Sequence, residues 1–145
     1  MALVEKLIYQ EDGRRTYGVL LKEGEEVTAA LLRFSRENYL GTSHFTALGD
    51  LKDVVLAYYD GKSIYKENRV SGVVQVLMFD GDIVFEHGTP QIDARLMVGK
   101  PDSTVAGGRF VRALASPALE IVITETPRHF RRQEDPQTRL PLIPL

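Results

Sequence analysis

The chain has 145 residues, of which 43% are hydrophobic and 26% are charged, the composition of one ordinary globular domain. It contains no cysteine, which excludes disulfides, thiolate catalysis and zinc or iron–sulfur sites held by cysteine. The formal net charge is −2, whereas domains dedicated to nucleic acids usually carry a strongly basic surface.

The charge is unevenly distributed along the chain. Residues 1–94 hold 10 basic and 15 acidic groups, and residues 95–145 hold 8 basic and 5 acidic groups. The basic excess can form one basic face or an ordinary solvated surface. No stretch reaches the about 18 apolar residues of a membrane span, and Glu5 interrupts the only apolar run near the N-terminus. We therefore expect a cytoplasmic protein with no membrane contact.

The first expected element is a hairpin. Two apolar runs, Leu3–Tyr9 and Thr16–Leu21, flank Asp12-Gly13. Asp-Gly pairs favour the positive φ angles of tight hairpin turns, so the two runs are predicted to pair.

Residues 24–39 are predicted to form the main helix. An apolar stripe recurs at helical spacing, made of Val27, Ala30, Leu31 and Phe34. Glu25 and Glu26 are expected in the first turn, where carboxylates complement the helix dipole. Asn38 or Gly41 is expected to supply the left-handed residue that ends the helix.

Most of the remaining chain is predicted to be strand. Asp60-Gly61 should join Val54–Tyr59 to a run around Ile64–Tyr65, and the first of these strands should be covered on both faces. By the same argument, Asp80-Gly81 should turn Val73–Phe79 back onto Ile83–Phe85. Further strands are expected at His44–Leu48, Ile92–Val98, Arg109–Leu114 and Leu119–Thr124.

The three histidines are His44, His87 and His129. No two of them have the spacing of a zinc-protease motif. His87, before Gly88, suits a turn, and His129, among arginines, suits the surface. His44 lies in an apolar strand and is the one expected in a pocket, either as a binding residue or as a hydrogen-bonded structural histidine.

Two further features carry charge or close backbone contact. Asp93 and Arg95 lie two apart on a predicted strand and therefore share a face. Gly107-Gly108 precedes Arg109 without a following helix pattern, so it fits no phosphate-binding loop and suits a close approach of backbones. For nucleic acids, the candidate patch is Arg112, Arg128, Arg131 and Arg132, with Arg109 beside it.

Several segments in this order resemble the PPC domain, the plants-and-prokaryotes-conserved domain. The matching segments are Ser43–Gly49, Val54–Tyr58, Val105–Gly108, Leu119–Glu125 and Arg131–Leu140. The resemblance covers residues 14–144 and treats 1–145 as a single domain with a C-terminal tail from about residue 136. It implies an α+β fold, in which a twisted, largely antiparallel sheet of short strands packs on one main helix. It also implies a homotrimer.

The resemblance leaves the function open between two classes. Plant members carry AT-hook DNA-binding motifs and assemble with other proteins, and stand-alone prokaryotic members are labelled as DNA-binding. No AT-hook is present here: Gly13-Arg14-Arg15 lacks the Arg-Gly-Arg-Pro core and lies in a predicted hairpin. We expect a regulatory, DNA-binding or assembly homotrimer, with a small-molecule binder or enzyme as the alternative. Catalysis is the less favoured of these, and no cofactor is expected.

Many bacterial relatives carry three histidines that look like a metal site. The corresponding positions here are Asp93, Arg95 and Arg109. Arginine cannot ligate a cation, so we expect no metal. An anion-binding cleft is the hypothesis in its place, with Arg95 and Arg109 as donors, Asp93 orienting one of them and His44 nearby. The alternative is a structural salt-bridge cluster.

Overall fold

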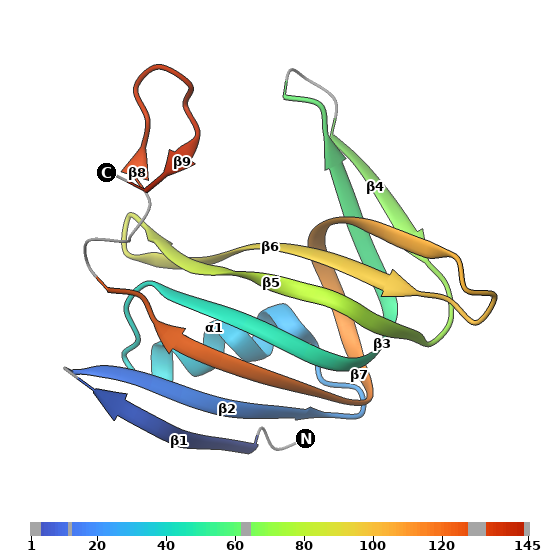
Figure 1. Cartoon of the computed structure of the whole chain (residues 1–145), viewed down its shortest axis with the longest axis horizontal. Helices are drawn as coiled ribbons and strands as arrows, with labels where there is room; N and C mark the ends of the chain where they lie inside the picture. Colours follow the sequence, from blue (N-terminus) through green and yellow to red (C-terminus); the bar gives the residue numbers. More distant parts are fainter. Residues whose placement is uncertain (1–3, 12, 62–64, 128–132, 144–145) are drawn as a thin grey trace.

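The computed structural model describes residues 4–11, 13–61, 65–127 and 133–143. Its elements, in chain order, are β1 (Val4–Glu11), β2 (Arg14–Lys22), α1 (Val27–Glu37), β3 (Ser43–Tyr59), β4 (Tyr65–Val70), β5 (Val74–Glu86), β6 (Thr89–Gly99), β7 (Val105–Glu125), β8 (Gln133–Glu134) and β9 (Pro141–Leu142) (Figure 1). The predicted α+β class is confirmed: a mostly antiparallel sheet accompanies one main helix.

Among the described residues, seven strands form one sheet in the order β1-β2-β7-β6-β5-β3-β4. Each neighbouring pair is antiparallel. β7 also pairs with β3, so the sheet curls back on itself and α1 lies against it (Figure 1). β8 and β9 form a separate two-stranded hairpin that is not hydrogen-bonded into the main sheet (Figure 1).

The core lies between α1 and the inner face of the curled sheet. The ring of Phe79 packs against Phe45 and Phe110, with ring centroids 5.5 and 4.8 Å apart. Phe34 of α1 meets Tyr17 of β2 edge to face at 5.0 Å. Such buried aromatic contacts stabilise beyond their buried area, so they join the helix and the strands into one core.

The predicted helical stripe is confirmed, but the ends of the helix differ from the prediction. All four stripe residues are buried. Glu26 is the cap before the helix, where its carboxylate accepts hydrogen bonds from the backbone of Thr28 and Ala29, and Glu25 precedes it. The prediction that both lie in the first turn is therefore wrong. The left-handed residue is Tyr39, at φ 52°, rather than Asn38 or Gly41.

Two predicted strand pairs are confirmed. β1 pairs with β2, and β3 pairs with β4 from Val54↔Val70 to Tyr59↔Tyr65. Residues 54–57 of β3 are consecutively buried, as expected for a strand covered on both faces, whereas its last two tyrosines are exposed. Ile64 lies outside the described residues.

The predicted turn at Asp80-Gly81 is wrong. β5 runs unbroken through this pair, and the chain turns instead at His87 and Gly88, both at positive φ. His87 is thus a turn residue, as predicted. Gly81 is not left-handed; it serves to admit a neighbour, because a side chain there would collide with Ala94 on β6.

Four predicted strands are halves of two longer ones. His44–Leu48 joins the segment from Val54 within β3, and the two segments predicted at 109–114 and 119–124 join within β7. β3 passes the interruption by register shifts, with Gly49 and Asp53 at positive φ. Bulges of this kind bend a strand without ending it, which lets β3 and β7 cross the curled sheet.

Candidate functional site

The outer face of the sheet gathers a row of polar side chains across three strands. His44 on β3 lies opposite Asp82 on β5, and Asp82 lies opposite Asp93 on β6. Directly paired residues of antiparallel strands project their side chains to the same face. Their strand neighbours, including Phe45 and Ala94, point into the core.

A second row lies two residues further along the same strands. Asp80 on β5 lies opposite Arg95 on β6, and Arg95 lies opposite Arg109 on β7. Because side chains alternate with a period of two, this row shares the outer face with the first. The sheet register therefore assembles carboxylates, guanidinium groups and one imidazole from four strands.

These side chains line a pocket of about 260 Å³. The pocket is lined by His44, Asp80, Gly81, Asp82, Asp93, Arg95, Arg109, Leu140 and Leu142. All four residues of the predicted anion cleft are thus brought together, from three different strands. We call this cavity the arginine pocket.

One hydrogen bond and one ion pair organise the arginine pocket. His44 Nδ1 lies 2.8 Å from Asp82 Oδ1, and Arg109 Nη1 lies 3.6 Å from Asp93 Oδ1. The His44 and Arg109 side chains remain 50% and 55% exposed, so the pairs leave both groups accessible. Asp93 therefore orients Arg109, as the sequence predicts for one of the two arginines.

Arg95 differs from its neighbours. Within the described residues it makes no ion pair and no hydrogen bond, although it lines the pocket between Asp80 and Arg109. Five N–H donors of a guanidinium are thus available to a ligand.

Sequence reasoning missed Asp80 and Asp82. The available signal is the two-residue spacing of Asp80 and Asp82, which places both on one face of a strand. The prediction of a turn at Asp80-Gly81 hides this signal, because a turn would remove both carboxylates from the sheet face. Their presence gives the pocket three carboxylates against two guanidinium groups. The cleft is therefore mixed in charge, and its capacity to hold an anion depends on the arginines locally and not on its net charge.

The residues present do not fit a metal ion. Across the described part of the chain, no group of three or more His, Cys, Asp or Glu side chains is arranged to hold one. Arg95 and Arg109 place two guanidinium groups, which cannot ligate a cation, among the carboxylates of the pocket.

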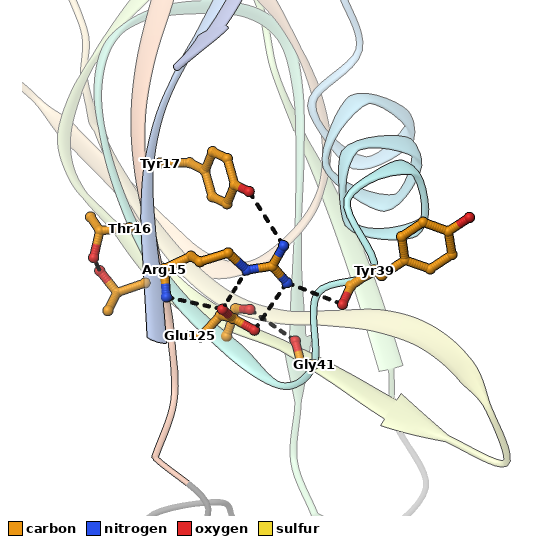
Figure 2. A network of polar contacts seen from close by, with 8 residues as sticks. Arg15, Thr16, Tyr17, Tyr39, Gly41 and Glu125 are labelled. Atoms are coloured by element: carbon orange, nitrogen blue, oxygen red, sulfur yellow. Dashed lines mark hydrogen bonds and ion pairs between the residues drawn. The ribbon is translucent and has the colours of Figure 1, made fainter. Parts of the chain in front are cut away.

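The beginning of β3, which carries His44, is anchored by a separate network (Figure 2). Arg15 Nε donates to Glu125 Oε1 at 2.8 Å, and the Arg15 guanidinium also donates to the carbonyl of Tyr39. The Ser43 hydroxyl donates to the Gly41 carbonyl at 2.9 Å. The network joins β2, β7 and the segment between α1 and β3, so it holds the strand entering the pocket.

The same network changes the pKa values of its ions. Burial raises the pKa of the Glu125 carboxyl, but hydrogen bonds from Arg15 lower it by more, so the pKa lies below its ordinary value. The hydrogen bond to Glu125 raises the pKa of Arg15. Both groups are therefore held in their charged forms.

The C-terminal hairpin closes one side of the arginine pocket. Leu140 and Leu142, beside and within β9, line it, and the Asp135 carboxylate accepts hydrogen bonds from the backbone and hydroxyl of Thr138 within the hairpin. These apolar side chains bring low-polarity surface close to the charged groups.

The nucleic-acid patch stays a prediction, because the structure describes only one of its four arginines. Arg112 is exposed on β7 and does not line the arginine pocket. Arg128, Arg131 and Arg132 lie outside the described residues, as does His129.

Comparison with known proteins identifies the fold and the family. The family model of the Plants and Prokaryotes Conserved (PCC) domain matches residues 9–127. No curated protein matches the chain.

Solved structures share the architecture. A plant- and prokaryote-conserved protein from Pyrococcus horikoshii is 22% identical, with a TM-score of 0.78 over 98% of this chain and 95% of that chain. A "putative DNA binding protein" from Bacteroides thetaiotaomicron is 18% identical, with a TM-score of 0.82 over 97% and 95%. A metal-containing protein from Archaeoglobus fulgidus is 22% identical, with a TM-score of 0.74 over 98% and 99%. Since the family model covers most of the sequence and these structures share the curled sheet, this chain belongs to the Plants and Prokaryotes Conserved domain family.

Proposed function

We propose that this chain is a binding protein for a small anion and that the arginine pocket is its site. Arg95 carries the proposal, since it lines the pocket without a hydrogen bond or ion pair among the described residues. Arg109 lies opposite it and is held by Asp93 only at 3.6 Å, so it can turn toward a ligand. Two adjacent guanidinium groups can share the oxygens of a phosphate or carboxylate.

The carboxylates of the pocket set the limits of this function. Asp82 is hydrogen-bonded to His44, and the charge of Asp93 is partly neutralised by Arg109. Asp80 lies opposite Arg95 on the outer face and would repel a ligand placed far from the two arginines. A compact anion bound directly between Arg95 and Arg109 suits this distribution best.

Calorimetric titration with inorganic phosphate and with acetate tests the proposal. We expect saturable binding, and we expect Arg95→Gln to weaken it by about tenfold to a hundredfold, since hydrogen bonds to charged groups contribute ~1.5–3 kcal/mol. Arg112→Gln is the matched control, because it removes an exposed arginine of β7 that does not line the pocket. Absence of binding, or equal loss in both variants, would show that the charges form a structural cluster only.

DNA binding is the second candidate function. Its support is the basic excess of residues 95–145 and the name of the similar protein from Bacteroides thetaiotaomicron. The net charge of −2 opposes it, because phosphate contacts dominate non-specific DNA affinity.

Fluorescence anisotropy of a labelled duplex, titrated with protein over a series of salt concentrations, tests this candidate. Micromolar binding with a steep salt dependence would support it. The variant Arg128→Gln/Arg131→Gln/Arg132→Gln should then lose binding while Arg95→Gln retains it. No binding at low salt would exclude DNA.

The same proposal covers assembly and location. A homotrimer in the cytoplasm, formed by a single domain over residues 1–145, is consistent with the family. Large apolar side chains remain exposed on the sheet, including Leu48, Leu77 and Val105, and such surface often contacts another copy. Among the described residues, no helix has the length and hydropathy needed to cross a membrane.

A further inference from the structure

A second hollow adjoins the arginine pocket. It has a volume of about 360 Å³ and is open on one side. Arg95 and Arg109 line both cavities, so they stand at the boundary between them. The other side chains around the hollow are mainly Tyr58, Tyr59, Met78 and Met97. We call it the aromatic hollow.

The aromatic hollow arises from two small residues beside Arg109. Gly107 lies opposite Met97 in the row next to Arg95 and Arg109, and it contributes no side chain to the outer face. Ala57 lies opposite Arg109 on β3 and is only 3% exposed, so it forms a low floor. The surface is therefore sunken where larger residues would have filled it.

The chemistry of the aromatic hollow contrasts with that of the arginine pocket. Tyr59 lies two residues after Ala57 on β3 and so shares its face; it is 53% exposed, and Met78 and Met97 across the hollow are also exposed. Aromatic rings stack on other rings, and thioether sulfurs make favourable contacts with ring edges. Exposure of these three side chains together suits a flat aromatic group.

We propose that the arginine pocket and the aromatic hollow form one site for a ligand with two parts, an anionic head and an aromatic ring. The head, a phosphate or carboxylate, lies between Arg95 and Arg109, and the ring lies over Gly107 against Tyr59 and Met97. Small-molecule sites of about 300–1,000 Å³ commonly combine apolar walls with a few polar groups, and the two adjoining cavities match that description. The inference rests on the proposed anion site and adds the class of ligand.

Matched probes separate the two halves of the ligand. Phenyl phosphate, inorganic phosphate and phenol are titrated calorimetrically against the full chain, with benzoate and acetate as the carboxylate pair. We expect phenyl phosphate to bind at least about tenfold more tightly than inorganic phosphate, because burying a ring on aromatic and thioether surface adds affinity. Tighter binding of benzoate than of acetate would assign the same ring effect to a carboxylate head.

Nuclear magnetic resonance locates the ring. The chain has three methionines, so methyl labelling gives few signals. Phenyl phosphate should shift the methyl signals of Met78 and Met97, whereas inorganic phosphate should shift neither strongly. A ring that shifts neither signal would overturn the inference.

Two variants test the aromatic hollow itself. Gly107→Leu should fill the hollow and so reduce the affinity for phenyl phosphate to that for inorganic phosphate. The fold should accept this change, because a Cβ at Gly107 makes only ordinary contacts, the nearest at 3.6 Å from the Leu96 carbonyl oxygen. Tyr59→Ala should weaken the binding of phenyl phosphate and leave that of inorganic phosphate unchanged. Tyr39→Ala is the matched control, because Tyr39 is an 88% exposed tyrosine that does not line the hollow.

The outcomes distinguish this inference from the proposed function. If inorganic phosphate and phenyl phosphate bind equally, the anion site stands and the aromatic half is wrong. If neither binds, the proposed function fails first. If Gly107→Leu lowers the oligomeric mass and leaves phenyl phosphate affinity unchanged, a second copy of the chain covers the hollow, and the inference is overturned.

Discussion

Gly81 shows how much one missing side chain decides in this sheet. It lies on β5 between two pocket carboxylates, opposite buried Ala94 on β6. A Cβ at this position would collide with Ala94 and would lie 2.6 Å from the Asp93 carbonyl oxygen. Backbone atoms of a central strand cannot easily move aside, so any side chain at this position should destabilise the fold.

Gly81→Ala should lower the free energy of unfolding by about 1–3 kcal/mol, the usual cost of overpacking. Gly107→Ala is the control, since its Cβ would make ordinary contacts only, and we expect a change within about 0.5 kcal/mol. Urea unfolding followed by circular dichroism measures both. Equal effects would mean that β5 and β6 can separate to admit the methyl group.

Ionisation of the Glu125 carboxyl should contribute to the free energy of unfolding. Its side chain is 14% exposed and receives hydrogen bonds from the backbone and guanidinium of Arg15 (Figure 2). Its pKa lies below the ordinary value of 4.5, despite the opposing effect of burial, because of the hydrogen bonds from Arg15. The charged form therefore stabilises the fold above about pH 4.5, and the contribution is lost as the pH falls through the lowered pKa.

Glu125→Gln should lower the free energy of unfolding at pH 7 by about 1–3 kcal/mol, the scale of hydrogen bonds to a charged group. The difference between the two proteins should shrink as the pH is lowered from 7 to 3. Urea titrations at several pH values check this. A difference that stays constant with pH would show that Glu125 acts through shape and not through charge.

At the scale of elements, α1 is held by its buried face. Its cap is supplied by the Glu26 carboxylate, and its apolar stripe faces the sheet, with Phe34 fully buried against Tyr17. An isolated helix of eleven residues is marginal in water, so packing against the sheet stabilises it.

Phe34→Ala should lower the free energy of unfolding by about 3–5 kcal/mol, because it leaves a cavity in the core. Arg33→Ala, one position earlier on the exposed face, should change it by less than about 0.5 kcal/mol. Thermal and urea unfolding of the two variants give the comparison. Similar losses would mean that helix propensity, and not packing, controls α1.

At the scale of the whole molecule, the open question is assembly. The curled sheet leaves several large apolar side chains on its surface, and the proposed homotrimer would cover part of them. Three copies would carry a formal charge of 3 × −2, that is −6, which keeps the particle soluble and disfavours non-specific DNA contact.

Light scattering coupled to gel filtration should give a mass of three times 16.3 kDa, independent of protein concentration over the micromolar range. A mass equal to that of one chain, at concentrations where the protein binds its anion, would contradict the homotrimer. It would also show that the site is complete within one chain.

The amino-acid sequence alone determined the local features. The apolar stripe of α1 follows from its helical spacing, and the hairpin of β1 and β2 follows from two apolar runs around an Asp-Gly pair. The continuous apolar run from Val54 predicts the part of β3 that is covered on both faces. The convergence of His44, Asp93, Arg95 and Arg109 in one cavity was expected from the resemblance to the PPC domain.

Tertiary structure decided what depends on neighbours in space. Asp60-Gly61 and Asp80-Gly81 are the same dipeptide, yet of these two glycines only Gly61 has a positive φ. Gly81 is extended because its strand pairs with β3 on one side and β6 on the other. The same pairing kept Asp80 and Asp82 on the sheet and so made the arginine pocket mixed in charge. Register between strands far apart in the chain created both cavities, since a single strand's pattern states which face a residue occupies but not which residues lie beside it.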